Sequence, residues 1–131
     1  MSETADGTAN RTPSDRTTAW VDGYLRAWRS NDPAEIGALF TDDAVYLTAP
    51  DAAPRRGRAA IVAGWVDDAD APGEWSFEWH LVHETSALAI VQGRTAYPAE
   101  RDYLNLWVIR FAPDGRASEF TEWYMPRAHE E

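Results

Sequence analysis

The sequence has neither cysteine nor lysine, and both absences narrow what the protein can do. Without cysteine there is no disulfide, no thiolate nucleophile and no cysteine-based zinc site, which fits a reducing compartment. All twelve basic residues are arginine, and 22 acidic residues outnumber them, so the formal net charge is -10. That charge argues against binding to nucleic acid or to anionic membranes, because both need a basic protein surface.

Long hydrophobic runs are also missing, both the length that spans a bilayer and the apolar segment of a signal peptide. We therefore expect a cytoplasmic protein that does not interact with membranes. No G-x-S-x-G, phosphate-loop or G-x-G-x-x-G motif occurs, so serine hydrolase, NTPase and dinucleotide-enzyme functions have no support. We expect no cofactor.

The chain does hold enough hydrophobic residues for one bulky core. Its 131 residues are 44% hydrophobic and include seven tryptophans. Residues 1–13 are small and polar, which predicts a disordered tail. Residues 14–128 then form a single domain.

Three helices are predicted in the first half. Ser14 can cap a helix over residues 14–30 whose apolar stripe includes Trp20, Tyr24 and Trp28. That stripe is either plain core, or Tyr24 and Trp28 line a cavity. Asp32 followed by Pro33 starts a short helix that carries Ile36, Leu39 and Phe40 and ends at residues 41–43. A third helix covers residues 58–69, with Trp65 facing inward.

Strands account for the remainder. A strand over residues 44–48 places Tyr46 and Thr48 on one face, and residues 50–57 form a loop. Four more strands are expected over residues 75–84, 87–97, 103–112 and 116–125. Helices first and an antiparallel meander afterwards indicate an α+β fold.

The last strand carries the residue that most needs a functional explanation. Alternation puts Phe120, Glu122 and Tyr124 on one face, and Thr121, Trp123 and Met125 on the other. A carboxylate between two aromatic residues is costly to bury without a partner or a purpose.

Metal binding is not expected. His80 and His83 are three residues apart on a strand, so they point to opposite faces and cannot hold one ion together. By alternation His83 faces inward, where it is a minor candidate for proton transfer at a pocket rim. The acidic residues at positions 67, 68 and 70 lack the spacing of a calcium loop, and we interpret them as solvated.

Several segments resemble the NTF2-like superfamily, which includes ketosteroid isomerases and SnoaL-like polyketide cyclases. The likeness covers residues 20–124 and is carried by residues 24–27 (YLRA), 31–44 (NDPAEIGALFTDDA), 56–61 (RGRAAI) and 109–111 (IRF) followed by a DG turn. The resemblance implies an α+β cone of three N-terminal helices packed on a curved, mostly antiparallel sheet. It also implies a homodimer through the outer sheet face, which Thr121, Trp123 and Met125 would suit.

Steroid isomerase activity is not expected despite this resemblance. In ketosteroid isomerases a tyrosine and a protonated aspartate form an oxyanion hole, and a second aspartate moves the proton. The tyrosine corresponds to Tyr24, but the base corresponds to Thr48 and the oxyanion aspartate to Trp107. Threonine cannot abstract a carbon-bound proton at neutral pH, and indole only donates a hydrogen bond.

The same resemblance implies the pocket. Glu122 would be the acid or base, with Tyr24 and Arg94 assisting, because inward parity on the strand 87–97 selects Leu88, Ile90, Gln92 and Arg94. Asp102 has the wrong parity to join them. A small apolar or aromatic molecule would contact the remaining inward side chains, Trp28, Tyr46, Thr48, Trp65, Trp107, Phe120 and Tyr124.

Two functions stay open at this point. The first is a cofactor-free cyclase, isomerase or hydrolase that uses Glu122, as SnoaL-like cyclases use an acidic residue and epoxide hydrolases of this fold use carboxylates with an arginine. The second is a non-catalytic ligand-binding or dimerisation module, in which Glu122 is satisfied by Arg94 or by a backbone donor; a direct pair with Arg94 would favour this second function. An unpaired Glu122 in an apolar setting would have a raised pKa, and a paired one would stay ionised.

Overall fold

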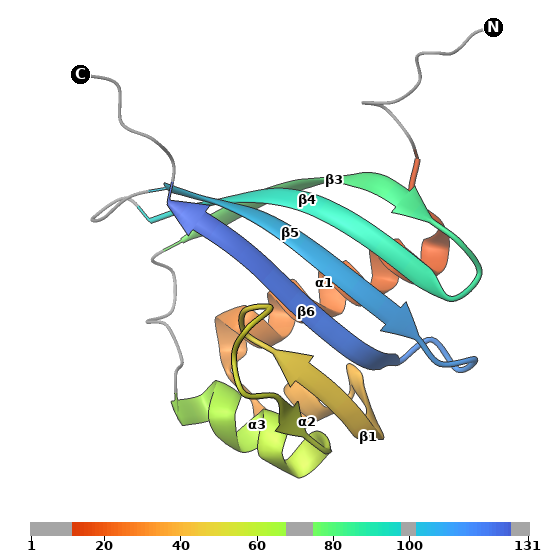
Figure 1. Ribbon diagram of the computed structural model, residues 1–131, viewed down its shortest axis with the longest axis vertical. Coiled ribbons are helices and arrows are strands. Elements are labelled where there is room, and N and C mark those ends of the chain that lie inside the picture. The colour runs from red at the N-terminus through yellow and green to blue at the C-terminus, as the bar shows by residue number, and fades with distance from the viewer. Residues whose placement is uncertain (1–11, 68–74, 98–101, 127–131) are drawn as a thin grey trace, which may run out of the picture.

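The computed structural model describes residues 12–67, 75–97 and 102–126, and its element order is that of an α+β domain (Figure 1). Three helices, α1 (Asp15–Ser30), α2 (Pro33–Gly37) and α3 (Arg58–Asp67), pack with a six-stranded sheet. Its strands are β1 (Phe40–Leu47), β2 (Arg55–Arg56), β3 (Ser76–Glu84), β4 (Leu88–Ala96), β5 (Asp102–Phe111) and β6 (Ala117–Pro126). The predicted tail up to residue 11 and the acidic positions 68 and 70 lie outside the described residues.

The sheet is mixed but mostly antiparallel, with the strand order β2-β1-β6-β5-β4-β3. Only one of the five pairings, between β1 and β6, is parallel. The long strands curve around α1, which crosses one face of the sheet (Figure 1). The predicted cone of helices on a curved sheet is therefore confirmed.

The start of α1 is fixed by its predicted cap and by the end of β3. The Ser14 hydroxyl oxygen accepts from Thr17 N–H at 3.2 Å. Ser14 N–H and the Thr17 hydroxyl donate to the Glu84 carboxylate, both at 2.8 Å. Although burial alone would raise it, these hydrogen bonds and Arg16 hold the pKa of Glu84 below its usual value.

The second helix is shorter than predicted. Asp32 caps it by accepting from Ala34 N–H at 2.9 Å, as expected, but it ends at Gly37 and Phe40 already begins β1. The backbone N–H of Ala117 donates to the carbonyl of Leu39, which shows that pairing with β6 wins over helix extension here. The predicted loop also contains β2, because Arg55 pairs with Tyr46.

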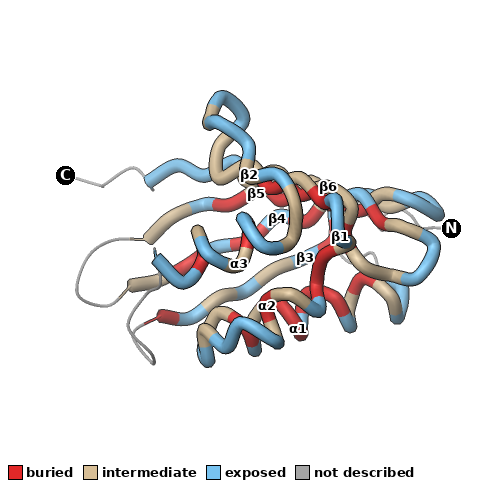
Figure 2. Tube along the Cα trace, turned by 90° about the horizontal axis from the view of Figure 1, so that it is seen from below, coloured by how far each residue is buried: buried red, intermediate tan, exposed pale blue. Residues whose placement is uncertain are grey.

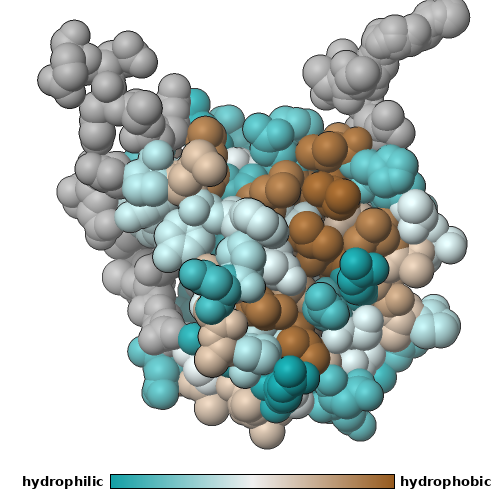
Figure 3. All heavy atoms as spheres, viewed as in Figure 1, coloured by the Kyte–Doolittle hydropathy of each residue, from teal (hydrophilic) through white to brown (hydrophobic). Residues whose placement is uncertain are grey.

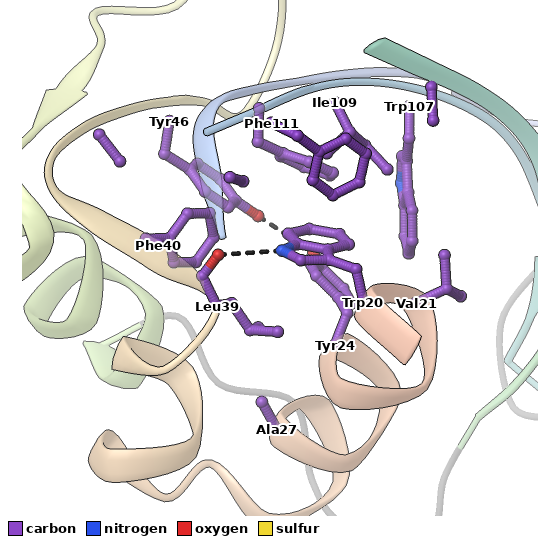
Figure 4. Packing of buried hydrophobic residues seen from close by; sticks show 14 of the residues in the cluster. Trp20, Val21, Tyr24, Ala27, Leu39, Phe40, Tyr46, Trp107, Ile109 and Phe111 are labelled. Atoms are coloured by element: carbon purple, nitrogen blue, oxygen red, sulfur yellow. Dashed lines mark hydrogen bonds between the residues drawn. The ribbon is translucent and has the colours of Figure 1, made fainter. Parts of the chain in front are cut away.

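The core lies between α1 and the inner sheet face (Figure 2). Trp20 of α1 stacks against Phe120 of β6, with ring centroids 5.6 Å apart, and meets Phe111 edge to face. Its indole N–H donates to the Leu39 carbonyl at 2.9 Å (Figure 4). This bond satisfies a buried donor and ties α1 to the start of β1.

The inner face of β4 carries small side chains, and this reverses the predicted parity. Ala89, Val91 and Thr95 are buried, whereas Gln92 and Arg94 are exposed. Gly93 shows the reason, because a Cβ there would lie 2.3 Å from the Phe77 ring. Large rings from neighbouring elements fill this space, so β4 contributes residues that leave room for them.

A β-bulge in β3 overturns the prediction that His83 faces inward. The register shifts between Leu81 and His83, so that His83 pairs with Ile90 and Glu84 with Ala89. The extra residue puts Glu84 opposite an inward residue and His83 opposite an outward one. His83 is exposed and does not line the pocket described below.

Candidate functional site

A cavity of about 380 Å³ opens between α1, α3 and the inner sheet face. This volume falls in the range of small-molecule sites. The side chains around it are mainly aromatic or neutral polar, and they are Tyr24, Trp28, Asn31, Tyr46, Thr48, Arg55, Trp65, Thr95, Tyr97, Tyr103, Asn105, Trp107, Glu122 and Tyr124.

The strand register arranges the inward side chains of β4, β5 and β6 in cross-strand rows. The innermost row is Ala89, Ile109 and Phe120, whose exposure is 0% in each case. Glu122 lies in the second row, directly opposite Trp107. Glu122 thus stands where the filled core ends and the cavity begins.

Two neutral donors hold one oxygen of the Glu122 carboxylate. Asn105 Nδ2 donates to Oε2 at 2.7 Å, and Trp107 Nε1 donates to the same oxygen at 3.4 Å. The Thr95 hydroxyl donates to Asn105 Oδ1 at 2.8 Å, which fixes the orientation of the amide. Within the described ranges, Oε1 receives no hydrogen bond and no arginine forms an ion pair with Glu122.

Burial raises the pKa of Glu122, and the hydrogen bonds from Asn105 and Trp107 oppose that shift without cancelling it. The physical cause is desolvation, because the charged carboxylate loses water and, among the residues that the structure describes, forms no ion pair in exchange. A carboxyl group of this kind takes up or releases a proton closer to neutral pH than an exposed glutamate does.

Tyr24 and Tyr46 meet beside the carboxylate. Their hydroxyl oxygens are 3.1 Å apart (Figure 4). Either hydroxyl can be the donor in this hydrogen bond. Burial, together with the nearby Tyr46 and Glu122, raises the pKa of Tyr24 well above its usual value. Tyr24 therefore stays protonated at neutral pH.

Aromatic rings form the walls and the rim of the cavity. Trp65 of α3 lies 4.8 Å from Tyr24 between ring centroids, and its indole N–H donates to Asn31 at 3.2 Å. At the strand ends Tyr97, Tyr103 and Tyr124 meet edge to face in series, with centroids 5.9 and 6.0 Å apart. These rings suit an apolar or aromatic ligand.

Most of the predicted site residues line this cavity. These are Tyr24, Trp28, Tyr46, Thr48, Trp65, Trp107, Glu122 and Tyr124, and their roles remain predictions. Phe120 does not line it, because it is fully buried behind Tyr24 and Tyr46.

The predicted meeting of Arg94 and Glu122 is wrong. Arg94 is exposed on the other face of β4, where its guanidinium binds Asp102 Oδ2 at 2.7 Å. The register implied by the family resemblance placed Arg94 inward together with Leu88, Ile90 and Gln92. In the structure the larger side chains face outward, and the glutamate is left with neutral donors.

Sequence reasoning missed six lining residues, namely Asn31, Arg55, Thr95, Tyr97, Tyr103 and Asn105. A signal existed for two of them. Tyr103 and Asn105 share the parity of Trp107 on β5, so placing Trp107 inward also places them inward. Arg55 had no such signal, since β2 has only two residues and depends on long-range pairing with β1.

The SnoaL-like domain family has a profile that matches residues 21–123. The chain belongs to this family. No curated protein sequence matches the chain. Within the described residues there is no cluster of three His, Asp or Glu side chains that could hold a metal, and no helix long and apolar enough to cross a membrane.

Solved structures share the fold of this SnoaL-like protein at low sequence identity. An NTF2-like protein of unknown function from Burkholderia xenovorans is 14% identical, covers 89% of this chain and 88% of its own, and has a TM-score of 0.71. A protein of unknown function with a cystatin-like fold from Methylobium petroleophilum is 21% identical, and the match covers 90% of this chain and 82% of that protein, with a TM-score of 0.68. A steroid delta-isomerase from Pseudomonas aeruginosa is 17% identical, and the match covers 86% of this chain and 82% of that enzyme, with a TM-score of 0.62.

Proposed function

We propose that this SnoaL-like protein binds a small apolar or aromatic molecule in the cavity and that Glu122 moves a proton on it without a cofactor. The observation that carries the proposal is the buried carboxylate at the cavity wall, held at Oε2 by two neutral donors. Perturbed carboxyl groups in a pocket are typical of proton-transfer sites. The reaction class is a cyclase-, isomerase- or hydrolase-like one.

The chemistry follows from the two oxygens of the carboxylate. Oε2 is fixed by Asn105 and Trp107, so Oε1 is the atom that takes a proton from a carbon next to a carbonyl group. The electron pair moves onto the carbonyl oxygen, and a hydroxyl of the Tyr24–Tyr46 pair donates to it. The enolate then recovers the proton at another carbon, or it attacks an electrophile in the same molecule.

Steroid isomerase activity stays outside the proposal. The steroid delta-isomerase neighbour shares the fold at 17% identity, which supports the architecture alone. Thr48 and Trp107 occupy the positions where the isomerase pattern has aspartates, and Glu122 reaches the pocket from β6 instead.

Deuterium exchange into phenylacetone, an aromatic ketone with acidic methylene protons, tests the proposal by NMR. The wild type is expected to accelerate exchange, and Glu122→Gln to abolish the acceleration while ligand quenching of tryptophan fluorescence persists. Glu119→Gln is the matched control, because Glu119 lies on the same strand next to Arg110 on the outer face. Acceleration that survives Glu122→Gln would disprove the role of Glu122.

The alternative is a non-catalytic ligand-binding or dimerisation module. The aromatic lining supports binding even without chemistry. Ligand quenching in wild type and Glu122→Gln alike, with no exchange in either, would favour this alternative.

We also propose a homodimer through the outer sheet face. Figure 3 looks onto this face and shows a hydrophobic patch over the strands. Trp123 and Met125 are 50% and 60% exposed, and Leu104 is 37% exposed on the neighbouring β5. Sedimentation of Trp123→Arg should show monomers if the face is the interface.

A cytoplasmic location, which the lack of cysteine fits, also remains part of the proposal.

A further inference from the structure

Arg55 occupies a place in the cavity that the proton-transfer chemistry above does not use. It pairs with Tyr46 across the short β2–β1 ladder, and cross-strand partners present their side chains to the same face. Tyr46 lines the cavity, and Arg55 lines it too. The neighbouring Arg56 pairs with Val45 and is exposed, so it points to the other side.

The position of the Arg55 guanidinium is defined from two sides. Its Cζ lies 5.7 Å from the Tyr46 ring centroid. On the other side is Gly64 of α3, where an added Cβ would come within 2.6 Å of Arg55 Nε and 2.7 Å of Cζ. Glycine in the middle of a helix is destabilising relative to alanine, and here it gives the guanidinium its space.

Among the fourteen lining residues, Arg55 and Glu122 are the two that carry charge. Neither is a partner of the other, because Glu122 is held by Asn105 and Trp107. A guanidinium matches a carboxylate in shape and charge, because its planar fork of N–H groups can donate two parallel hydrogen bonds to the two oxygens.

We propose that the cavity selects molecules that carry a carboxylate on an aromatic or apolar body, and that Arg55 is the specificity-determining residue that binds this carboxylate. The inference rests on the proposed ligand-binding function of the same cavity. The carboxylate would sit against β2 and α3, and the apolar body would extend along Trp65 and the other rings toward Glu122.

Two probes of similar shape test this inference, cinnamate and its neutral amide, cinnamamide, in low salt at neutral pH. Calorimetric titration of the wild type is expected to show that cinnamate binds about 10- to 100-fold more tightly than cinnamamide. This ratio of dissociation constants is the range expected for hydrogen bonds to a charged group. Arg55→Gln should remove the preference and leave cinnamamide binding unchanged. Arg56→Gln, the matched control, should keep the preference.

The outcomes separate this inference from the proposed function. Equal affinity of the wild type for the two probes overturns the role of Arg55, even if Arg55→Gln fails to fold, while leaving the ligand-binding function standing. A preference that persists in a folded Arg55→Gln variant also overturns it. If the wild type binds neither probe, the role of Arg55 is overturned and the aromatic pocket loses support as well.

Discussion

Replacement of Asn105 by leucine should change how the stability of the protein depends on pH. Asn105 Nδ2 donates to Glu122 Oε2 at 2.7 Å, the shorter of the two hydrogen bonds that this carboxylate accepts. Leucine has a similar volume but no donor. The substitution therefore removes the main stabilisation of the ionised carboxylate with little change in packing.

The sign of the effect follows from the pKa of Glu122. Burial raises this pKa above that of the unfolded chain, so the folded state keeps the proton to higher pH. The free energy of unfolding consequently falls as pH rises through the window between the two values. Loss of the Asn105 bond raises the folded-state pKa further, so the variant loses more stability across a wider window.

The magnitude comes from the two protonation states of Glu122. A hydrogen bond to a neutral group contributes about 0.5–1.5 kcal/mol, and one to a charged group about 1.5–3 kcal/mol. Asn105→Leu should therefore cost roughly 1 kcal/mol more at high pH than at low pH, or a few degrees in Tm. The Thr95 hydroxyl also loses its acceptor, but that cost is the same at every pH.

Urea unfolding of four proteins between about pH 5 and pH 9 measures this difference. They are the wild type, Asn105→Leu, Glu122→Gln and the double variant. Glutamine cannot ionise, so in its background the cost of Asn105→Leu should not vary with pH. The reasoning would be refuted if the loss of unfolding free energy caused by Asn105→Leu still varied with pH when Glu122 is replaced by glutamine. It would also be refuted if that loss were the same at every pH when Glu122 is present.

Three further predictions concern other parts of the fold. Gly64→Ala should keep or raise Tm through helix propensity but weaken cinnamate binding, because its Cβ displaces the Arg55 guanidinium. Gly93→Ala should lower the free energy of unfolding by about 1–3 kcal/mol in urea, since its Cβ meets the Phe77 ring at 2.3 Å, and Phe77→Leu should recover part of the loss. Glu84→Gln should make the free energy of unfolding depend less on pH in acid. Hydrogen bonds at the start of α1 lower the pKa of Glu84 in the folded state, so the stability that the ionised carboxylate contributes is lost as pH falls through this pKa. A variant that unfolds in acid like the wild type would contradict the Glu84 prediction.

The sequence predicted what depends on local signals. Ser14 and Asp32 were identified as caps because capping needs only neighbouring backbone groups. Strand alternation placed Glu122 and Tyr124 on the inner face, and both line the cavity. The four long strands were predicted within one or two residues, since their turns are marked in the sequence.

What failed depends on contacts between distant segments. Arg94 was assigned inward from strand parity, but the space inside is taken by rings such as Phe77. The bulge at Val82 that turned His83 outward has no mark in the sequence. Asn105 was overlooked because its value as a donor is evident only when Glu122 is seen across the strand pair.

A second bulge decides whether Glu122 has any chemistry at all. Phe111 pairs with Ala117, but Arg110 pairs with Glu119, so Ser118 is an extra residue on β6. Its hydroxyl donates to the Arg110 carbonyl at 3.3 Å. The extra residue changes the parity of the strand, and this allows Ala117 and Phe120 to be buried on the same face.

If Ser118 instead paired with Arg110 in a regular ladder continued from Phe111 and Ala117, Trp107 would lie opposite Thr121 and Glu122 would turn to the outer face. There water would solvate the carboxylate, and neither burial nor the indole of Trp107 would act on it. The acid–base character of Glu122 therefore depends on the bulge at Ser118, at the start of β6 and four positions before the carboxylate. Deletion of Ser118 should therefore retain proton exchange in the NMR assay, because a regular ladder that runs directly from Ala117 to Glu119 keeps Glu122 opposite Trp107.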